Sequence, residues 1–555
     1  MSVHPLRRVA VAVAVAVTAV FAAAACTSGN PPVGPSGTSS STPSTVRVTP
    51  GPPTTLRVLA GSELADMQPI LDEAAKATGV TVKMTFTGTL DGAQTVAEGR
   101  ADGVYDAVWF SSTRYLETIP AARQRLASSS RIMGSPVVLG LREPVARRLG
   151  WDRTPVTWSD IADAAKRGEF TFAMTDPAAS NTGFSALVAV ASALEGSGRV
   201  LDAAAIEQVS ASLTGFFAAQ RLTAGSSGWL TDAFLRRNLG ADPGPALDGL
   251  INYEASLIAV NRTRKLPEPL VLVYPTDGVV SADYPLTLLA GVGDAARTAH
   301  QRLADYLRMP DVQRAIVERT ARRAALPGIA LPPGLPDGLV ELPFPGTRSA
   351  IDALLTAYFD RIRRPSRTAY VLDVSGSMAG ARLNALQQAL SGLTGTDTSL
   401  SGQYCRFRSR EDVILLPFNQ TPGKPLAFTI DEQNPQPSRD AVRTAITGLH
   451  AGGDTAVYDS LVSAYKVLDS ASDQDRFISI VLMTDGESNS GRSLADFQAF
   501  VASRPGATPV PVFPILFGEA AESQMQAIAT ATRGQLWDAR NGELAHAFCQ
   551  IRGYQ

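Results

Sequence analysis

The sequence predicts two α/β modules in one chain. Apolar stretches of strand length alternate with amphipathic helical patterns through both halves of residues 55–555, which is typical of largely parallel sheets covered by helices. Residues 326–346, LPGIALPPGLPDGLVELPFPG, hold too many prolines and glycines for regular structure and separate the two halves. A chain of 555 residues has room for about two to four domains, which is consistent with this division.

Composition and missing motifs exclude several classes of protein. Hydrophobic residues make up 45% of the chain and charged residues 18%, which is a globular balance. The 50 Lys and Arg residues nearly match the 52 Asp and Glu residues, so the net charge of -2 gives no basis for binding nucleic acid. The four histidines lie far apart, and neither a P-loop nor a nucleophile elbow occurs. We therefore expect a binding protein and no enzyme.

The chain begins with a pattern typical of export. Arg7 and Arg8 supply positive charge ahead of an unbroken apolar and small-residue run over 9–24. The alanines before Cys26 resemble the lipobox of bacterial lipoproteins, although Ala23 stands where that pattern prefers Leu. The resemblance implies removal of residues 1–25 and a diacylglyceride on the Cys26 thiol, which anchors the protein to the extracytoplasmic face of the cell membrane. A plain secretory signal or an uncleaved anchor is the alternative.

The segment after Cys26 is expected to be a flexible tether. Residues 26–54 consist largely of Ser, Thr, Pro and Gly, a composition that cannot bury a core. Function therefore resides in residues 55–555. We expect the first module over 55–345, a connecting helix over 346–366 and the second module over 367–555.

The first module places hydroxyl groups where predicted strands end. The strand over 56–60 leads into Gly61-Ser62 and a helix start, whose free amide groups favour an anion or polar ligand. The strands over 80–86 and 105–110 end at Thr87 and Ser111. Later come a Thr-Asp-Pro loop over 175–184 and a Tyr-Glu pair at 253–254.

This order of elements resembles type 2 periplasmic-type solute-binding proteins, the receptors of ABC importers. The resemblance implies a two-lobed periplasmic-binding-protein-like module with a two-stranded hinge, the second lobe running from roughly residue 140 to 270. It also implies a cleft for a small polar or anionic solute. The alternatives are that these groups are helix caps and turn residues, or that the cleft has lost its ligand and serves as a scaffold. The cleft residues we expect are Ser62, Thr87, Ser111, Ser180 and Tyr253.

The second module collects oxygen ligands at strand ends. The strand over 369–372 runs into Asp373-Val-Ser375-Gly-Ser377, and the strand over 477–483 leads to Asp485. A glycine turn before Thr455 adds another hydroxyl at a helix start. Parallel strands bring such loops to one sheet edge, and oxygen donors without nitrogen or sulfur suit Mg²⁺, Mn²⁺ or Ca²⁺ better than zinc.

These three elements resemble the von Willebrand factor A (VWA) domain with its metal-ion-dependent adhesion site. The resemblance implies a doubly wound, Rossmann-like domain in which Asp485 often acts through water. Few of its direct ligands are anionic, so the ion favours a carboxylate from a protein or envelope partner. The alternative is an ion that only stabilises the loops, and Glu487 at the rim is read as solvated. The residues expected around the divalent cation are Asp373, Ser375, Ser377, Thr455 and Asp485.

The cysteines complete the prediction. If Cys26 carries lipid, Cys405 and Cys549 remain as an even pair in an oxidising compartment, and we expect a disulfide between them. Two separate buried thiols are the alternative.

The sequence therefore predicts a lipid-anchored binding protein with a metal-dependent partner site and a solute cleft. The alternative is the solute receptor of an ABC importer that uses the second module as a docking arm.

Overall fold

The computed structural model describes residues 50–241, 245–469, 476–504, 509–541 and 544–553. The predicted export signal, the lipidation of Cys26 and all but the last residues of the tether lie outside these ranges. Within the ranges, no helix combines the length and the apolar character that crossing a bilayer requires. The described part of the chain from residue 50 onward belongs to one compact unit.

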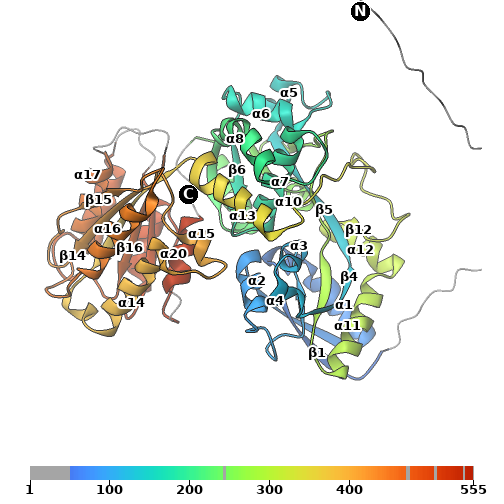
Figure 1. The fold of residues 1–555 in the computed structure, drawn as a ribbon, viewed down its shortest axis with the longest axis horizontal. Coiled ribbons are helices and arrows are strands. Elements are labelled where there is room, and N and C mark those ends of the chain that lie inside the picture. Colours follow the sequence, from blue (N-terminus) through green and yellow to red (C-terminus); the bar gives the residue numbers. More distant parts are fainter. Residues whose placement is uncertain (1–49, 242–244, 470–475, 505–508, 542–543, 554–555) are drawn as a thin grey trace, which may run out of the picture. The chain divides into compact units, whose positions relative to one another are not determined.

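The first sheet combines both ends of the first module (Figure 1). Its strand order is β2-β1-β3-β11-β4, with β1 parallel to β2 and β3 and with β11 antiparallel to β3 and β4. Strand β1 already begins at Thr54 and pairs there with Val80, two residues before the predicted strand start. The bounds are β1 Thr54–Ala60, β2 Val80–Phe86, β3 Ala107–Trp109, β4 Leu126–Arg131 and β11 Pro285–Leu289.

Helices cover this sheet with one apolar face each. In α1 the buried residues are Ile70, Leu71, Ala74 and Thr78, and Gly79 ends the helix with φ 77°, a conformation that glycine adopts without strain. A 3-10 turn, η1, precedes α1. The bounds are η1 Ser62–Met67, α1 Gln68–Thr78, α2 Thr89–Ala97, α3 Arg114–Glu117, α4 Pro120–Arg123, α11 Asp294–Leu307 and α12 Pro310–Thr320.

The second sheet is built from the middle of the first module. Its order is β10-β5-β8-β6-β7, and β9 and β12 also pair with β5. The chain passes from the first sheet to the second at Ile132, returns between Ala282 and Pro285, and crosses again between Thr320 and Arg323, so three segments join the lobes. This sheet begins at Met133, ahead of the predicted lobe start near residue 140. The bounds are β5 Met133–Arg142, β6 Phe172–Thr175, β7 Gln220–Ala224, β8 Gly249–Tyr253, β9 Leu270–Val273, β10 Ser281–Ala282 and β12 Arg323–Ala324.

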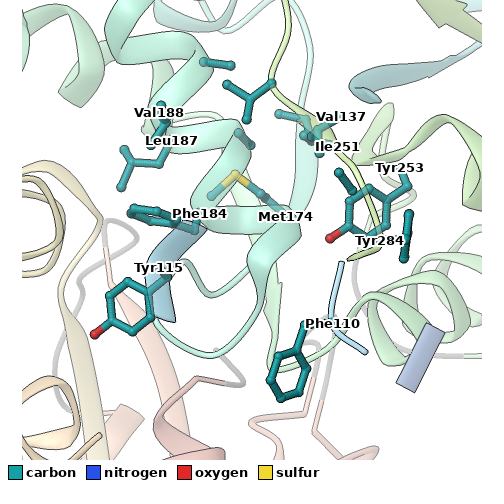
Figure 2. Close-up of a cluster of buried hydrophobic side chains, with 14 of the residues drawn as sticks. Phe110, Tyr115, Val137, Met174, Phe184, Leu187, Val188, Ile251, Tyr253 and Tyr284 are labelled. Atoms are coloured by element: carbon teal, nitrogen blue, oxygen red, sulfur yellow. The ribbon is translucent and has the colours of Figure 1, made fainter. Parts of the chain in front are cut away.

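Helix α7 lies inside the second lobe. Every residue from Asn181 to Ser192 is buried, and most of them are apolar, as expected of a helix buried around its circumference. Phe184, Leu187 and Val188 of α7 belong to the same apolar cluster as Met174 (Figure 2). The helix bounds of this lobe are α5 Glu143–Leu149, α6 Trp158–Lys166, α7 Asn181–Glu195, α8 Ala203–Phe217, α9 Ser227–Asn238 and α10 Glu254–Thr263.

The connecting helix α13 (Arg348–Ala357) packs against the second lobe and is not a flexible linker. Ile351 and Leu354 are fully buried, and a π-helical turn over Tyr358–Ile362 continues the helix. The ring of Tyr358 stands 5.0 Å from that of Phe217 in α8, centroid to centroid. The apolar face predicted from the sequence therefore packs on the second lobe.

The third sheet has the order β15-β14-β13-β16-β17-β18, parallel except for β15. Alternate residues of β13 face opposite sides: Tyr370 and Leu372 join one apolar cluster with α14, α16 and α20, whereas Ala369 and Val371 join another with α17 and α18. The bounds are β13 Ser366–Asp373, β14 Asp412–Phe418, β15 Leu426–Thr429, β16 Phe477–Thr484, β17 Val512–Leu516, β18 Trp537–Asp538, α14 Ala381–Ser391, α15 Gly402–Cys405, α16 Pro435–Thr447, α17 Val457–Asp469, α18 Leu494–Ala502, α19 Glu522–Thr532 and α20 Leu544–Arg552.

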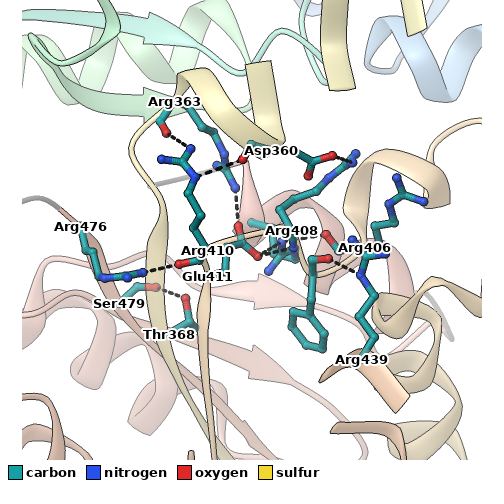
Figure 3. A network of polar contacts seen from close by, with 12 residues as sticks. Asp360, Arg363, Thr368, Arg406, Arg408, Arg410, Glu411, Arg439, Arg476 and Ser479 are labelled. Carbon is teal, nitrogen blue, oxygen red and sulfur yellow. Dashed lines mark hydrogen bonds and ion pairs between the residues drawn. The ribbon is translucent and has the colours of Figure 1, made fainter. Parts of the chain in front are cut away.

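A network of buried charged side chains lies just before the first residues of β13 and β14 (Figure 3). Glu411 is 1% exposed, and its carboxylate accepts hydrogen bonds from the guanidinium groups of Arg363 and Arg552. The backbone amide of Arg408 donates to the same carboxylate at 2.8 Å. Nearby, Cys405 and Cys549 form a disulfide with their Cα atoms 5.1 Å apart. The connecting segment, the start of β14 and the last helix are thereby tied together.

Candidate functional site

Asp373 is the anchor of the expected metal site. It ends β13 at the carboxyl edge of the third sheet and is fully buried. Its Oδ1 accepts a hydrogen bond from the backbone amide of Ser375 at 2.7 Å, and its Oδ2 accepts one from the hydroxyl of Thr484 at 2.6 Å. The carboxylate is therefore fixed by its own loop and by the end of the neighbouring strand β16.

Three loops meet at this edge through direct hydrogen bonds. The hydroxyl of Ser377 donates to Oδ1 of Asp485 at 2.7 Å, and the hydroxyl oxygens of Ser375 and Ser377 lie 3.1 Å apart. The amide of Gly376 donates to the carbonyl of Gly453 at 2.8 Å, which ties the first loop to the glycine turn. Gly453 has φ 87°, a conformation that a residue with a side chain adopts only under strain.

Thr455 is held in this arrangement by its backbone. Its amide donates to the side-chain carbonyl of Asn489 at 2.8 Å, and its carbonyl accepts from the amide of Asn489 at 3.0 Å. The residue is 4% exposed. The structure thus gathers the loops that carry all five predicted residues at one sheet edge. Thr484 and Asn489, which hold Asp373 and Thr455, were not predicted, because motif spacing gives no information about such supports.

The charged groups at this edge include two carboxylates and one guanidinium. Burial raises the pKa of Asp373, and the neighbouring Asp485 raises it further. Arg382 donates to Oδ2 of Asp485 at 2.6 Å and is the basic group at the rim. Among the described residues, three or more His, Cys, Asp or Glu side chains nowhere gather as metal ligands. The donor set here consists of two carboxylates and three hydroxyls, which fits a hard divalent cation.

The first module contains a cavity of about 400 Å³. Its wall is formed by the start of η1, the ends of β2, β3 and β8, and the starts of α2, α7 and α9. Both lobes contribute, and the amide of Thr89 in the first lobe donates to the carbonyl of Ala179 in the second at 3.3 Å. All five predicted cleft residues line this cavity: Ser62, Thr87, Ser111, Ser180 and Tyr253.

Tyr253 lies at the base of the cleft. It is 1% exposed, and its hydroxyl accepts a hydrogen bond from the side-chain amide of Asn181 at 3.1 Å. Burial raises the pKa of Tyr253, so the phenol stays protonated at neutral pH. It therefore presents a neutral hydroxyl to the cavity.

Sequence reasoning missed the carboxylates and rings of the cleft. Glu63 and Asp91 line it, as do the side chains of Phe86, Phe110 and Trp229. Glu63 directly follows the predicted helix start at Ser62, so an acidic side chain in the first turn was the available indication. Two further lining residues, Trp537 and Gln550, come from the second module.

His546 and Cys549 do not form a catalytic pair. Cys549 is in the disulfide, and Nδ1 of His546 lies 3.6 Å from Oδ2 of Asp91. Its Nε2 lies 2.6 Å from the side-chain nitrogen of Gln550. The histidine thus belongs to the surroundings of Asp91.

Comparison with known proteins gives a family for each module. Residues 56–319 match the family described as bacterial extracellular solute-binding protein, and residues 369–546 match the von Willebrand factor type A domain. No curated protein gives a match to this sequence.

Several solved structures align with this chain at low identity. The periplasmic binding protein AfuA from Actinobacillus pleuropneumoniae is 12% identical over 56% of this chain and 98% of its own, with a TM-score of 0.44. The sulfate-binding protein SubI from Mycobacterium tuberculosis H37Rv is 19% identical over 50% of this chain and 89% of its own, with a TM-score of 0.38. A von Willebrand factor type A protein from Catenulispora acidiphila is 20% identical over 34% of this chain and 42% of its own, with a TM-score of 0.29. The two family matches support an extracellular solute-binding domain over residues 56–319 and a VWA domain over residues 369–546.

Proposed function

We propose that the VWA domain binds a divalent cation and uses it to engage a carboxylate of a protein or envelope partner. Asp373, Ser375, Ser377 and Thr455 would hold the ion, with Asp485 acting through water. The observation that carries the proposal is the hydrogen-bonded convergence of Asp373, Ser377 and Asp485 at one sheet edge. Mg²⁺, Mn²⁺ and Ca²⁺ all suit this oxygen donor set.

The residues account for the preference for a carboxylate. When bound, the cation supplies a Lewis-acidic position for an incoming oxygen. Asp373 is the one anionic residue among the four direct donors, because Ser375, Ser377 and Thr455 contribute neutral hydroxyls. The site therefore keeps positive character and attracts an acidic side chain of a partner.

The same proposal gives the first module a small solute as ligand. Its cavity is lined by both lobes and by hydroxyl groups at strand ends, which is the arrangement that a polar ligand requires. The family of the first module is extracellular, and we place the protein on the extracytoplasmic face of the membrane, with Cys26 as its lipid anchor and residues 26–54 as its tether.

A peptide experiment tests the partner site. The full-length protein is applied to immobilised peptides that contain glutamate, or glutamine at the same positions, in Mg²⁺ or in EDTA. We expect binding to the glutamate peptide in Mg²⁺ alone, with loss in Asp373→Ala. The control Asp440→Ala removes a carboxylate of α16 that pairs with Arg443, with both side chains partly exposed, and should bind as the wild type does. Equal binding in Mg²⁺ and EDTA would contradict the proposal.

The importer receptor is the second candidate, and the two-lobed cavity is the observation that favours it. In that case, cells lacking the protein should take up its solute more slowly. Rescue by Asp373→Ala would then show that the metal site is dispensable for transport, whereas failure of rescue would show that both modules are required.

A further inference from the structure

The charge of the solute cleft indicates which class of solute it takes; the inference rests on the proposed solute-binding role of the cavity. None of the described residues that line the cavity is Lys, Arg or His. Two carboxylates, those of Glu63 and Asp91, line it instead. An anionic solute would therefore meet negative charge without a cationic side chain in the wall.

Glu63 occupies the position where an anion would meet the start of η1. The pKa of this carboxyl is lowered by the neighbouring backbone amide of Glu63 itself and by the hydroxyl of Ser111, although loss of water raises it more. The carboxylate also lies over Gly61, where an added Cβ would come within 2.6 Å of Oε2. A carboxylate of the chain thus already lies at the helix start that sequence reasoning assigned to an anion.

The nearest guanidinium, that of Arg322, does not neutralise the cleft. Arg322 is 3% exposed, and its Nη1 donates to both carboxylate oxygens of Asp66 at 2.8 and 2.7 Å. Its Nη2 donates to the backbone carbonyl of Glu63 at 2.7 Å. Arg322 is therefore paired with the carboxylate of Asp66 and contacts Glu63 through its backbone carbonyl.

Glu63 is partly exposed, but its loss of water contact makes the charged form costly without a counter-charge. Removal from water raises the pKa of Glu63 more than its hydrogen bonds and Arg322 lower it. A cation in the cleft would restore the favourable environment that the carboxylate lost. Asp91 lies 3.6 Å from Nδ1 of His546, so its charge is shared with that ring when the histidine is protonated.

The cleft also presents aromatic rings from both lobes. Phe86 and Phe110 come from the first lobe, and Trp229 and Tyr253 from the second. Phe86 is 45% exposed, although large apolar side chains are mostly buried in this protein. Aromatic faces attract organic cations through their negative quadrupole, most strongly where water is excluded.

We propose that the cleft binds a small organic cation, an alkylammonium compound, with the Glu63 carboxylate as its counter-charge and the surrounding aromatic rings as its walls. Hydroxyl groups of Ser62, Thr87 and Ser180 remain to accept hydrogen bonds from an ammonium group or from polar substituents. The site discriminates against sulfate and phosphate, because each would stand against the carboxylates of Glu63 and Asp91.

Calorimetric titration of the full-length protein tests this proposal. The probes are tetramethylammonium, ethylammonium, sulfate, phosphate and glucose. We expect both ammonium probes to bind and Glu63→Gln to weaken both, because each loses its counter-charge. Ethylammonium should lose about tenfold or more, since it also loses a charge-assisted hydrogen bond, which tetramethylammonium cannot make. Glu98→Gln, which removes an exposed carboxylate paired with Arg100, should leave binding unchanged.

Phe86→Leu provides a second variant, because Phe86 is half exposed and its loss should not impair folding. We expect it to weaken tetramethylammonium binding severalfold. Binding of sulfate, phosphate or glucose without binding of either ammonium probe would overturn the cation proposal and leave the solute-binding role standing. Absence of binding by all five probes would overturn both. Equal ammonium affinity in wild type, Glu63→Gln and Phe86→Leu would also overturn the proposal.

Discussion

Replacing Glu411 with Gln should destabilise the VWA domain strongly. Glu411 is 1% exposed, and its carboxylate faces the guanidinium groups of Arg363 and Arg552, whose side chains are each 7% exposed. Glutamine keeps the shape but removes the negative charge, so two buried cations lose their counter-charge. Breaking a buried pair from one side typically costs about 3–5 kcal/mol, and we expect a loss in this range.

A solvent-exposed ion pair between a glutamate and an arginine provides the matched control. Glu207 pairs with Arg361, and their side chains are 66% and 46% exposed. Glu207→Gln should therefore cost less than about 1 kcal/mol. Urea unfolding followed by tryptophan fluorescence and circular dichroism measures both variants. A loss for Glu411→Gln no larger than that for Glu207→Gln would refute the reasoning.

The pH dependence of the stability difference between wild type and Glu411→Gln gives an internal check. Burial alone would raise the pKa of Glu411, but Arg552 and Arg363 hold it below the ordinary value. A carboxyl with a lowered folded-state pKa stabilises the protein above its unfolded pKa of about 4.3, and this contribution is lost as pH falls through the folded value. The wild type should thus lose its advantage over Glu411→Gln progressively below about pH 4. An advantage that stays constant down to strong acid would contradict the ion-pair account.

Two further predictions concern the disulfide and the rim of the metal site. The Cys405–Cys549 disulfide joins residues that are 144 apart in sequence. In the chain-entropy account, the double variant Cys405→Ala with Cys549→Ala should lower the free energy of unfolding by about 5 kcal/mol. Urea unfolding measures this loss, and an unchanged free energy of unfolding would contradict the account. Arg382 pairs with Asp485, so Arg382→Gln should strengthen Mn²⁺ binding by about two- to fivefold in a calorimetric titration, and weaker binding would show that the arginine supports the site.

Local pattern was enough to predict much of the fold and of the sites. Alternation of strand and helix patterns predicted the α/β class, and strand ends marked by hydroxyl residues predicted five side chains that line one cavity. Parallel strands explain this success: their carboxyl ends meet at one edge, so residues far apart in sequence become neighbours.

The missed features depend on contacts that no local pattern encodes. Glu411 meets Arg363 and Arg552 across separations of 48 and 141 residues, and each of these residues is charged and would be expected at the surface. Strand β18 has two residues, too few for a periodic pattern. Helix α18 is nine residues long and was not predicted either. The cleft position of Glu63 depends on how η1 turns, which the residue types do not determine.

Thermal unfolding with and without a divalent cation tests the metal site most directly. A ligand that binds the native state raises the melting temperature, by an amount that grows with its concentration relative to the dissociation constant. After removal of carried-over ions, the full-length wild type should melt at a higher temperature in Mg²⁺, Mn²⁺ or Ca²⁺ than in EDTA. Asp373→Ala should lose that rise, whereas Asp440→Ala should keep it. A wild type whose melting temperature is the same with every cation and with chelator would contradict the central claim that Asp373, Ser375, Ser377, Thr455 and Asp485 form a cation site.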